Sequence, residues 1–455
     1  MKAIQKIYIL VCTGMVLLSC NGDDQEQLFQ DSPSGRISAR EQELKDHLTS
    51  AENGWKTTYF PNNDKFGGFT LLMEFSEDGS VKMTSDIDEN NEVRSSRYDL
   101  NLGATTKLTF STRNHIHKLN NSSFPAELRG RGYEGDNEFN FYGEKDGKLH
   151  FKSVRNEVDV VFEKASAEDW NNMVLQNMKM ADNLFPQPGD PVFQVIKVIK
   201  EGKTFLYNFN YNVLKRFVES TTPIDDKLVE KSFGIGFTPE GIVLNPPLEL
   251  ESAKFTDFLW DEEERKFVST AENAVAEITY SNEPAYINND YKDIGTSVYS
   301  LAFSPGQRFD QVLNTHAFKE MYSQVDKDAQ KDHPEFQLQD IVIKFNKQAD
   351  APQNTHTLDF YFFYGQTQYF ASYAVEFKKE DKKLKFNYLN EINGNASNFK
   401  EYLMPLIYFF TNPEGLIVNN EGRFWPQYTN SGYTLTSAED ATLRVHCASN
   451  YYRNN

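Results

Sequence analysis

A series of short strands between Trp55 and about Lys164 leaves this chain few choices of fold. In these segments apolar and polar residues alternate, which is the spacing of strands that bury one face. Turn residues separate the segments, and two turns contain Asp-Gly, at Asp78-Gly79 and Asp146-Gly147, a pair that favours tight hairpins. The pattern therefore predicts an antiparallel meander of about eight strands.

Two predicted helices flank this meander. The first spans about residues 38 to 52, where Ser38 and Glu41 have the spacing of a capping box. The second spans residues 167 to 182 and carries apolar residues at helical spacing on one face. The order of helix, strands and closing helix is similar to that of a lipocalin-like barrel. We therefore expect a mainly β, helix-flanked N-terminal domain over residues 37–186.

The stretch FPQPGDP at residues 185 to 191 is rich in turn-forming residues and predicts a domain boundary. Residues 190–280 contain several strand-like segments, which predicts a β-rich middle region. Residues 281–455 mix predicted strands with helices at about 306 to 326 and 399 to 410. This mixture predicts an α+β C-terminal region.

One local similarity links the two ends of the chain. The segment DKKLKFNYL at residues 381 to 389 is similar to DGKLHFKSV at residues 146 to 154, and both combine a turn with an alternating strand. A single matched hairpin is weak evidence for a repeat, so a second barrel related to the first is an alternative to an unrelated C-terminal region.

The N-terminus has the features of a bacterial lipoprotein signal. Basic residues at 2 and 6 precede an apolar run from residue 7 to 18, which is too short for a membrane span and matches the core of a signal peptide. The sequence LLS before Cys20 resembles a lipobox, so we expect residues 1–19 to be removed and Cys20 to be lipidated, with residues 20–36 as a tether. The alternative is an ordinary secretory peptide with a chance cysteine.

Charge and cysteine content restrict the possible partners. The formal net charge is −19, and removal of Lys2 and Lys6 with the signal gives −19 − 2 = −21. Such an acidic surface repels phosphate backbones, which argues against a nucleic-acid partner. Only Cys12, Cys20 and Cys447 occur. The first leaves with the signal and the second carries lipid, so no intramolecular disulfide is expected, and Cys447 is interpreted as a small apolar side chain.

A candidate metal site lies in the sequence NHIH. If this segment is a strand, His115 and His117 share one face and can present two imidazoles to one metal. Glu138, together with Asp136 on a nearby predicted strand, would supply a carboxylate ligand. The alternative is that these histidines are solvated or structural. The sequence indicates no other cofactor.

A candidate binding platform lies in GRFWPQY, where Phe424, Trp425 and Tyr428 surround a proline. Partly exposed aromatic rings stack on sugar rings or peptide side chains. The alternative is packing within a β core.

Two further segments are interpreted as structural. Asp86, Asp88 and Asn90 imitate the start of a calcium loop, but Asn91 and Arg97 stand where glycine and glutamate are required, so we expect an acidic, solvated hairpin. The glycines of GRGYEGDNEF predict a strained turn that leads into a strand.

Several of these segments together identify a family resemblance. The sequences NGW at 53 to 55, GGF at 67 to 69, LTFSTRNHIH at 108 to 117 and GRGYEGDNEF at 130 to 139 lie downstream of the lipobox. Together they resemble a lipoprotein family of the Bacteroidetes, domain of unknown function 4302. The match is clearest in the N-terminal domain and extends less distinctly to FTPEGIVLNPPLEL at 237 to 250.

The resemblance implies a setting and no activity, so no catalytic residue follows from it. Lipoproteins of this kind occur beside outer-membrane uptake systems that pair a transporter with a ligand-capturing lipoprotein. The acidic residues Asp23, Asp24 and Glu26 after Cys20 resemble the signal for export to the outer face of the outer membrane.

These observations favour a surface lipoprotein that acts as an accessory binding protein for nutrient capture. The candidate ligands are a glycan, a peptide or a chelated metal, and the candidate partners are the membrane, the transporter and its ligand-capturing lipoprotein. One alternative is a surface hydrolase, in its most concrete form metal-dependent, and another is an adhesion or scaffold module. Enzymatic activity stays open, although the residues favour binding.

Overall fold

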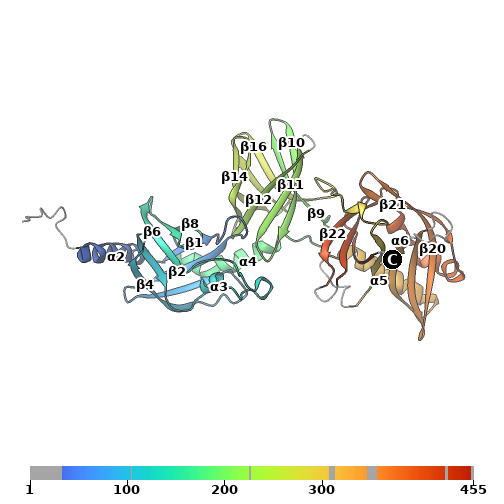
Figure 1. Ribbon diagram of the computed structural model, residues 1–455, viewed down its shortest axis with the longest axis horizontal. Helices are drawn as coiled ribbons and strands as arrows, with labels where there is room; N and C mark the ends of the chain where they lie inside the picture. The colour runs from blue at the N-terminus through green and yellow to red at the C-terminus, as the bar shows by residue number, and fades with distance from the viewer. Residues whose placement is uncertain are drawn as a thin grey trace, which may run out of the picture.

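The computed structural model describes residues 33–103, 105–224, 227–306, 313–345, 356–425 and 429–451. It contains three closed barrels, each of eight antiparallel strands, which follow one another along the long axis in the order of the sequence (Figure 1). The expected mainly β fold is confirmed, including closure of the N-terminal meander. Within the described residues, no helix has both the length and the apolar character needed to cross a membrane.

The first barrel is closed by pairing of its first and last strands, with Trp55 opposite Lys164. Before it, α2 (Pro33–Thr49) packs against β2, β4 and β5, and Leu44 and Leu48 on its inner face are fully buried. The indole of Trp55 donates a hydrogen bond to the Leu48 carbonyl at 2.8 Å, which fixes the helix to the barrel. The strands are β1 (Trp55–Tyr59), β2 (Phe69–Phe75), β3 (Ser80–Ser85), β4 (Arg94–Leu102), β5 (Thr106–Phe110), β6 (Glu138–Lys145), β7 (Lys148–Ser153) and β8 (Asp159–Lys164).

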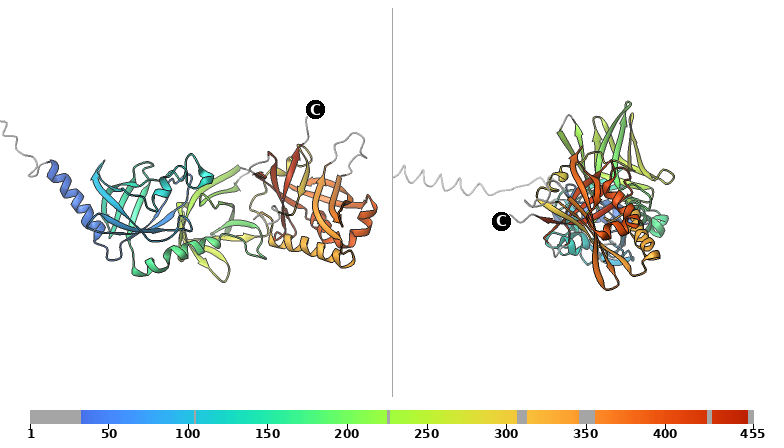
Figure 2. Two further views of the ribbon diagram at one scale, coloured as in Figure 1. Left: turned by 90° about the horizontal axis from the view of Figure 1, so that it is seen from below. Right: turned by 90° about the vertical axis from the view of Figure 1, so that its right-hand side faces the viewer.

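The middle barrel is a simple meander closed by β9 and β16, with Phe193 opposite Ser281. Before it, a π-helical turn at Asp169–Met173 continues into α4 (Val174–Asp182). This helix runs along the first two barrels (Figure 2) and contacts both β12 and Thr70 of β2. The strands are β9 (Phe193–Lys200), β10 (Lys203–Asn212), β11 (Phe217–Ile224), β12 (Lys227–Thr238), β13 (Gly241–Leu250), β14 (Ala253–Asp261), β15 (Lys266–Ala271) and β16 (Ala274–Ser281).

The C-terminal barrel differs because two helices interrupt its meander and pack on each other. The first, α5 (His316–Asp332), follows β17, and the second, α6 (Gly394–Thr411), follows β21. The strands are β17 (Val298–Phe303), β18 (Phe336–Lys344), β19 (His356–Tyr364), β20 (Thr367–Glu380), β21 (Lys383–Glu391), β22 (Leu416–Arg423), β23 (Ser431–Ser437) and β24 (Arg444–Tyr451).

Capping residues explain why both helices depart from their predicted bounds. The expected start of the first helix near residue 306 is wrong, because Thr315 is the N-cap and its hydroxyl accepts a hydrogen bond from Phe318 N. The second helix starts earlier than expected, because Asn393 caps it by accepting from Ala396 N at 2.9 Å. Pro405 therefore lies inside this helix.

The hairpins that suggested a second barrel occupy different positions. DGKLHFKSV contains the turn between the sixth and seventh strands of the first barrel, whereas DKKLKFNYL contains the turn between the fourth and fifth strands of the C-terminal barrel. Asp146 and Asp381 both have positive φ, as tight turns require. The C-terminal region is indeed a barrel, but the shared sequence reflects turn chemistry at positions that do not correspond.

Candidate functional site

The first two barrels meet through glycines that permit direct backbone contact. Gly67 N donates to Lys215 O at 2.8 Å, and Gly68 N donates to Ile235 O at 3.0 Å. A Cβ added to Gly234 would lie 2.7 Å from Gly67 Cα, which no real side chain tolerates. The contact between barrels therefore explains Gly67, whereas a Cβ at Gly68 would collide with Thr58 and Phe60 of the first barrel itself.

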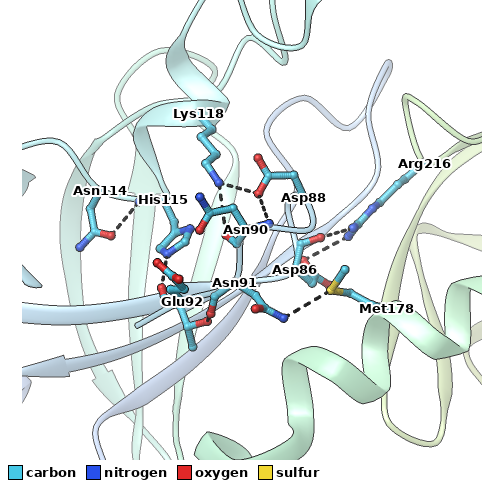
Figure 3. Close-up of polar contacts among 11 residues, drawn as sticks. Asp86, Asp88, Asn90, Asn91, Glu92, Asn114, His115, Lys118, Met178 and Arg216 are labelled. Carbon is cyan, nitrogen blue, oxygen red and sulfur yellow. Dashed lines mark hydrogen bonds and ion pairs between the residues drawn. The ribbon is translucent and has the colours of Figure 1, made fainter. Parts of the chain in front are cut away.

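Arg216, in the turn between β10 and β11, contacts both barrels at this junction. Its guanidinium lies 3.2 Å from the Asp86 carboxylate and also donates to the Asp86 carbonyl (Figure 3). It donates to the Gly68 carbonyl as well, at 2.9 Å. It stacks over the rings of Phe69 and Phe237, at 4.5 and 5.2 Å from their centroids. One side chain of the middle barrel thus occupies a pocket formed by both barrels.

The expectation of a solvated acidic hairpin is wrong for Asp86, which is buried. Besides Arg216, its carboxylate accepts from Thr70 N at 2.8 Å and from the Asn177 amide at 3.4 Å. Asp88 lies nearer the surface and pairs with Lys118 at 2.6 Å (Figure 3). The oxygens that imitate a calcium loop are therefore used for packing and ion pairs.

The predicted strand placement of the two histidines is also wrong. The strand ends at Phe110, and a turn leads into the short helix α3 (His117–Asn120), so His115 and His117 do not share a strand face. His115 Nε2 donates to Glu92 O at 2.7 Å (Figure 3). His117 Nδ1 accepts from Asn114 N at 3.1 Å, and its Nε2 donates to Phe110 O at 3.0 Å. Burial lowers the pKa of both imidazoles, which favours their neutral forms.

The predicted carboxylate ligands are also engaged elsewhere. Glu138 pairs with Lys107 at 2.6 Å, and Asp136 accepts from Arg155 N at 2.7 Å. Among the residues that the structure describes, no group of three or more His, Cys, Asp or Glu side chains is arranged to hold a metal. The histidines and carboxylates are thus not assembled into a metal site there.

The predicted aromatic platform is only partly visible. Phe424 is buried and its ring contacts that of His446 at a tilt, with ring centroids 4.7 Å apart, so it faces the protein. Trp425 is half-buried, and Tyr428 lies outside the described residues. Cys447 is buried on β24, and burial raises the pKa of its thiol, as expected for a structural cysteine.

A large cleft lies between the middle and C-terminal barrels. This cleft has a volume of about 850 Å³ and is lined by the outer face of β10 and β11, the linker between the two barrels, β22 and Arg444 of β24. Its size falls in the range typical of ligand pockets, roughly 300–1,000 Å³.

One wall of the cleft follows from strand alternation in NFNYN. Phe209 and Tyr211 point into the middle barrel, so Asn208, Asn210 and Asn212 project from its outer face. On β11, Glu219 pairs in register with Asn210, and Thr221 pairs with Asn208. The wall is therefore a polar face built on two paired strands.

The opposite wall comes from the C-terminal barrel. Asn419, Asn420 and Glu421 lie at the end of β22, and Arg444 lies on β24, on the other side of β23. Arg444 Nε donates to Leu313 O at 3.0 Å. Burial lowers the pKa of this guanidinium, although Glu421 opposes the effect. The wall thus presents a partly desolvated cation next to amides and a carboxylate.

Sequence reasoning did not find this cleft, although part of its signal was present. The alternation in residues 208 to 212 indicates a row of outward amides, and Asn419-Asn420 stands out as a polar pair at the end of an apolar strand. The sequence does not indicate that these two segments, which lie in different barrels, face one another.

Comparisons with known proteins give a family and little else. The family described as "Domain of unknown function (DUF4302)" matches residues 25–262, which is slightly more than half of the chain and spans the first barrel and most of the middle one. No curated protein matches the sequence.

Solved structures give only weak likenesses. A DNA polymerase sliding clamp from Pseudomonas aeruginosa is 10% identical and covers 90% of this chain and 96% of its own, with a TM-score of 0.16. A DNA polymerase III subunit beta from Borrelia burgdorferi is 12% identical and covers 91% and 98%, with a TM-score of 0.14. TM-scores this low do not show a shared fold.

Proposed function

Because the chain belongs to the DUF4302 family, which is described only as a domain of unknown function, we propose its function from the geometry of its own cleft. The protein is an accessory binding protein on the outer face of the outer membrane, and it captures a nutrient beside an uptake transporter. The cleft of about 850 Å³ between the middle and C-terminal barrels is the observation that carries this proposal.

The lining of the cleft suits binding better than packing. Amide, carboxylate and cationic side chains project into it from rigid strands, and partly buried aromatic residues such as Phe185 and Tyr286 border it. Ligand pockets combine apolar surface with a few fixed polar groups in this way. Strands fix the position of these groups more tightly than loops would.

The shape of the molecule supports a surface role. The helix α2 lies at the end of the molecule away from the C-terminal barrel (Figure 1), and the lipidation site Cys20 precedes this helix in the sequence. A lipid at Cys20 would attach the first barrel to the membrane. The cleft would then stand one barrel farther out, where a nutrient from the medium can reach it.

A ligand screen that compares the wild type with a variant whose cleft is blocked tests the proposal. The full chain in detergent is heated with neutral oligosaccharides, acidic oligosaccharides, peptides or ferric chelates, and the melting temperature is recorded. We expect one class to raise the melting temperature of the wild type and not that of Asn210→Trp, which fills the cleft. Asn387→Trp, on an exposed face of β21 outside the cleft, is the matched control. A ligand that stabilises all three proteins equally, or no stabilising class at all, would refute the proposal.

A further inference from the structure

The polar groups of the cleft that have no partner indicate what it binds, if the proposed function is correct. Asn210 and Glu219 are exposed cross-strand neighbours, and within the described residues neither side chain makes a hydrogen bond or an ion pair. By contrast, the side-chain amide of Asn208 is already hydrogen-bonded to the backbone of Tyr286. Its Nδ2 donates to Tyr286 O, and its Oδ1 accepts from Tyr286 N. The free part of this wall is therefore the region around Asn210, Glu219 and Thr221.

The facing wall also has side-chain groups that can still form hydrogen bonds with a ligand. Arg444 donates from Nε to Leu313, and no carboxylate of the described chain lies within ion-pair distance of its guanidinium, so its terminal nitrogens stay available. Within the part of the chain that the structure describes, Glu421 accepts from Thr434 at one carboxylate oxygen only. These two side chains can therefore donate to and accept from the same ligand.

The charges of the cleft balance. Lys215 and Glu219 belong to the middle barrel, and Arg444 and Glu421 belong to the C-terminal barrel, so each wall carries one charge of each sign. A site that selects an ion would show an excess of one sign. The arrangement favours an uncharged ligand that offers donors and acceptors together.

Hydroxyl groups meet this requirement, because each both donates and accepts. A peptide main chain does so too, but it is usually bound along the open edge of a sheet. The strands of the three described barrels are closed into rings, so the cleft offers side chains from a sheet face and no open edge. Along β10 these side chains recur every second residue, about 6.8 Å apart, which suits an extended ligand.

We infer that the cleft binds a neutral polyhydroxylated chain, that is, an uncharged oligosaccharide. Asn210, Glu219 and Thr221 hydrogen-bond its hydroxyls from one side, and Arg444 and Glu421 do so from the other. The ring of Phe185, and the face of the Tyr286 ring that the Lys382 ammonium does not cover, give its C–H faces apolar surface.

Isothermal titration of the full chain in detergent tests this inference. The probes are neutral oligosaccharides of glucose, mannose, galactose and xylose, an oligogalacturonate as the acidic counterpart, and a tryptic peptide mixture. We expect a neutral oligosaccharide to bind with an affinity that persists in high salt. The double variant Asn210→Ala/Glu219→Ala should bind it roughly tenfold more weakly, or worse, since at least two hydrogen bonds are lost.

The matched control is Glu376→Ala/Asn387→Ala, a cross-strand Glu–Asn pair of the C-terminal barrel outside the cleft. It should bind like the wild type, and melting curves should show all variants folded. If only the oligogalacturonate or the peptides bind, and binding depends on Asn210 and Glu219, the cleft is the binding site but the neutral oligosaccharide is refuted. If a neutral oligosaccharide binds equally to both double variants, its site is elsewhere. If none of these probes binds, the oligosaccharide is refuted, and the proposed function fails as well unless a ferric chelate stabilises the wild type and not Asn210→Trp.

Discussion

At the residue scale, the pair of Asp86 and Arg216 decides how firmly the first two barrels are joined. A buried ion pair gains little over a well-packed apolar pair, but removal of one partner leaves a charge without compensation. Among the described residues, only Thr70 N and the Asn177 amide still donate to the Asp86 carboxylate once the guanidinium is gone. The pair therefore affects stability mainly because removal of one partner leaves the other as a buried charge without compensation.

We expect Arg216→Met to destabilise the first two barrels by about 3–5 kcal/mol, as urea denaturation would measure. The double variant Asp86→Leu/Arg216→Met should recover part of this loss, because it removes the unpaired charge as well. Lys82→Met is the control, since Lys82 and Glu74 form an exposed pair that contributes about 0–1 kcal/mol. Equal losses for Arg216→Met and Lys82→Met would contradict the proposed role of the buried pair.

His446 makes the C-terminal barrel sensitive to pH. Burial, with a smaller effect of Arg444, lowers the pKa of this imidazole from 6.5 to about 4. Because the folded-state pKa lies below the unfolded value, the neutral imidazole stabilises the fold above pH 6.5, and this stability is lost as pH falls toward 4. Between pH 7.5 and 5.5 the loss should be about 1 kcal/mol.

Hydrogen exchange of the β23 and β24 amides measures this loss. Protection should fall between pH 7.5 and 5.5 in the wild type, after correction for the intrinsic exchange rate, and less so in His446→Gln. The middle barrel contains no histidine and serves as an internal reference. An identical pH response of the wild type and His446→Gln would show that this imidazole is not responsible.

The sequence did not reveal these roles because the partners are remote. Arg216 lies 130 residues beyond Asp86, so local spacing made the aspartate look solvated. The metal hypothesis needed His115 and His117 on one strand face, but the strand ends at Phe110 and a turn follows it. Local sequence patterns therefore give the wrong environment for a residue whose partners lie far away in the sequence.

At the element scale, the contact between Gly67 and β12 predicts a sharp steric effect. Gly234→Ala places a methyl group 2.7 Å from Gly67 Cα and from Phe66 O, so the two barrels must separate slightly. We expect a loss of about 1–3 kcal/mol, the usual cost of overpacking, measured by urea denaturation. Gly394→Ala is the control, because no atom lies near its Cβ position. Equal stability of the two variants would argue against direct backbone contact at the junction.

The strand pattern was predictable to the extent that its signals are local. Asp-Gly turns and alternation gave the eight strands of the first barrel, because hairpin register depends on the turn itself. Closure of each barrel joins its first and last strands, for example Trp55 with Lys164, and no local pattern encodes that pairing. The start of α5 was missed because the capping hydroxyl of Thr315 lies after a segment with helical spacing.

At the scale of the whole molecule, the proposed lipid on Cys20 determines where the barrels are held. Cys20→Ser removes the acylated thiol, so we expect the chain to move from the membrane fraction to the soluble fraction. Metabolic labelling with a fatty acid should mark the wild type only. Cys447→Ser, which changes a buried thiol, should remain labelled and membrane-bound. Retention of Cys20→Ser in the membrane would refute the lipid anchor.

The two junctions between barrels differ in the contacts that cross them. The first has backbone hydrogen bonds, the buried ion pair and α4 packed on both sides. At the second, Val192 N donates to Ala441 O at 3.1 Å, and a small apolar cluster surrounds Phe193 and Ile417. The linker is hydrogen-bonded to the middle barrel at Tyr286. It is hydrogen-bonded to the C-terminal barrel at Asn288 and at the Ile287 carbonyl, which accepts from Lys382 Nζ at 3.1 Å.

We therefore expect the first two barrels to move as one body and the C-terminal barrel to move against them around the cleft. Spin labels at Tyr142→Cys, Leu259→Cys and Leu389→Cys, one exposed strand position in each barrel, allow the distances to be measured. The distribution between the first and middle barrels should be narrow, and that between the middle and C-terminal barrels should be broader. An oligosaccharide that bridges both walls of the cleft should narrow the second distribution and leave the first unchanged, because it adds contacts only across the second junction. Equally narrow distributions without ligand would mean that the cleft is preformed and that binding requires no closure.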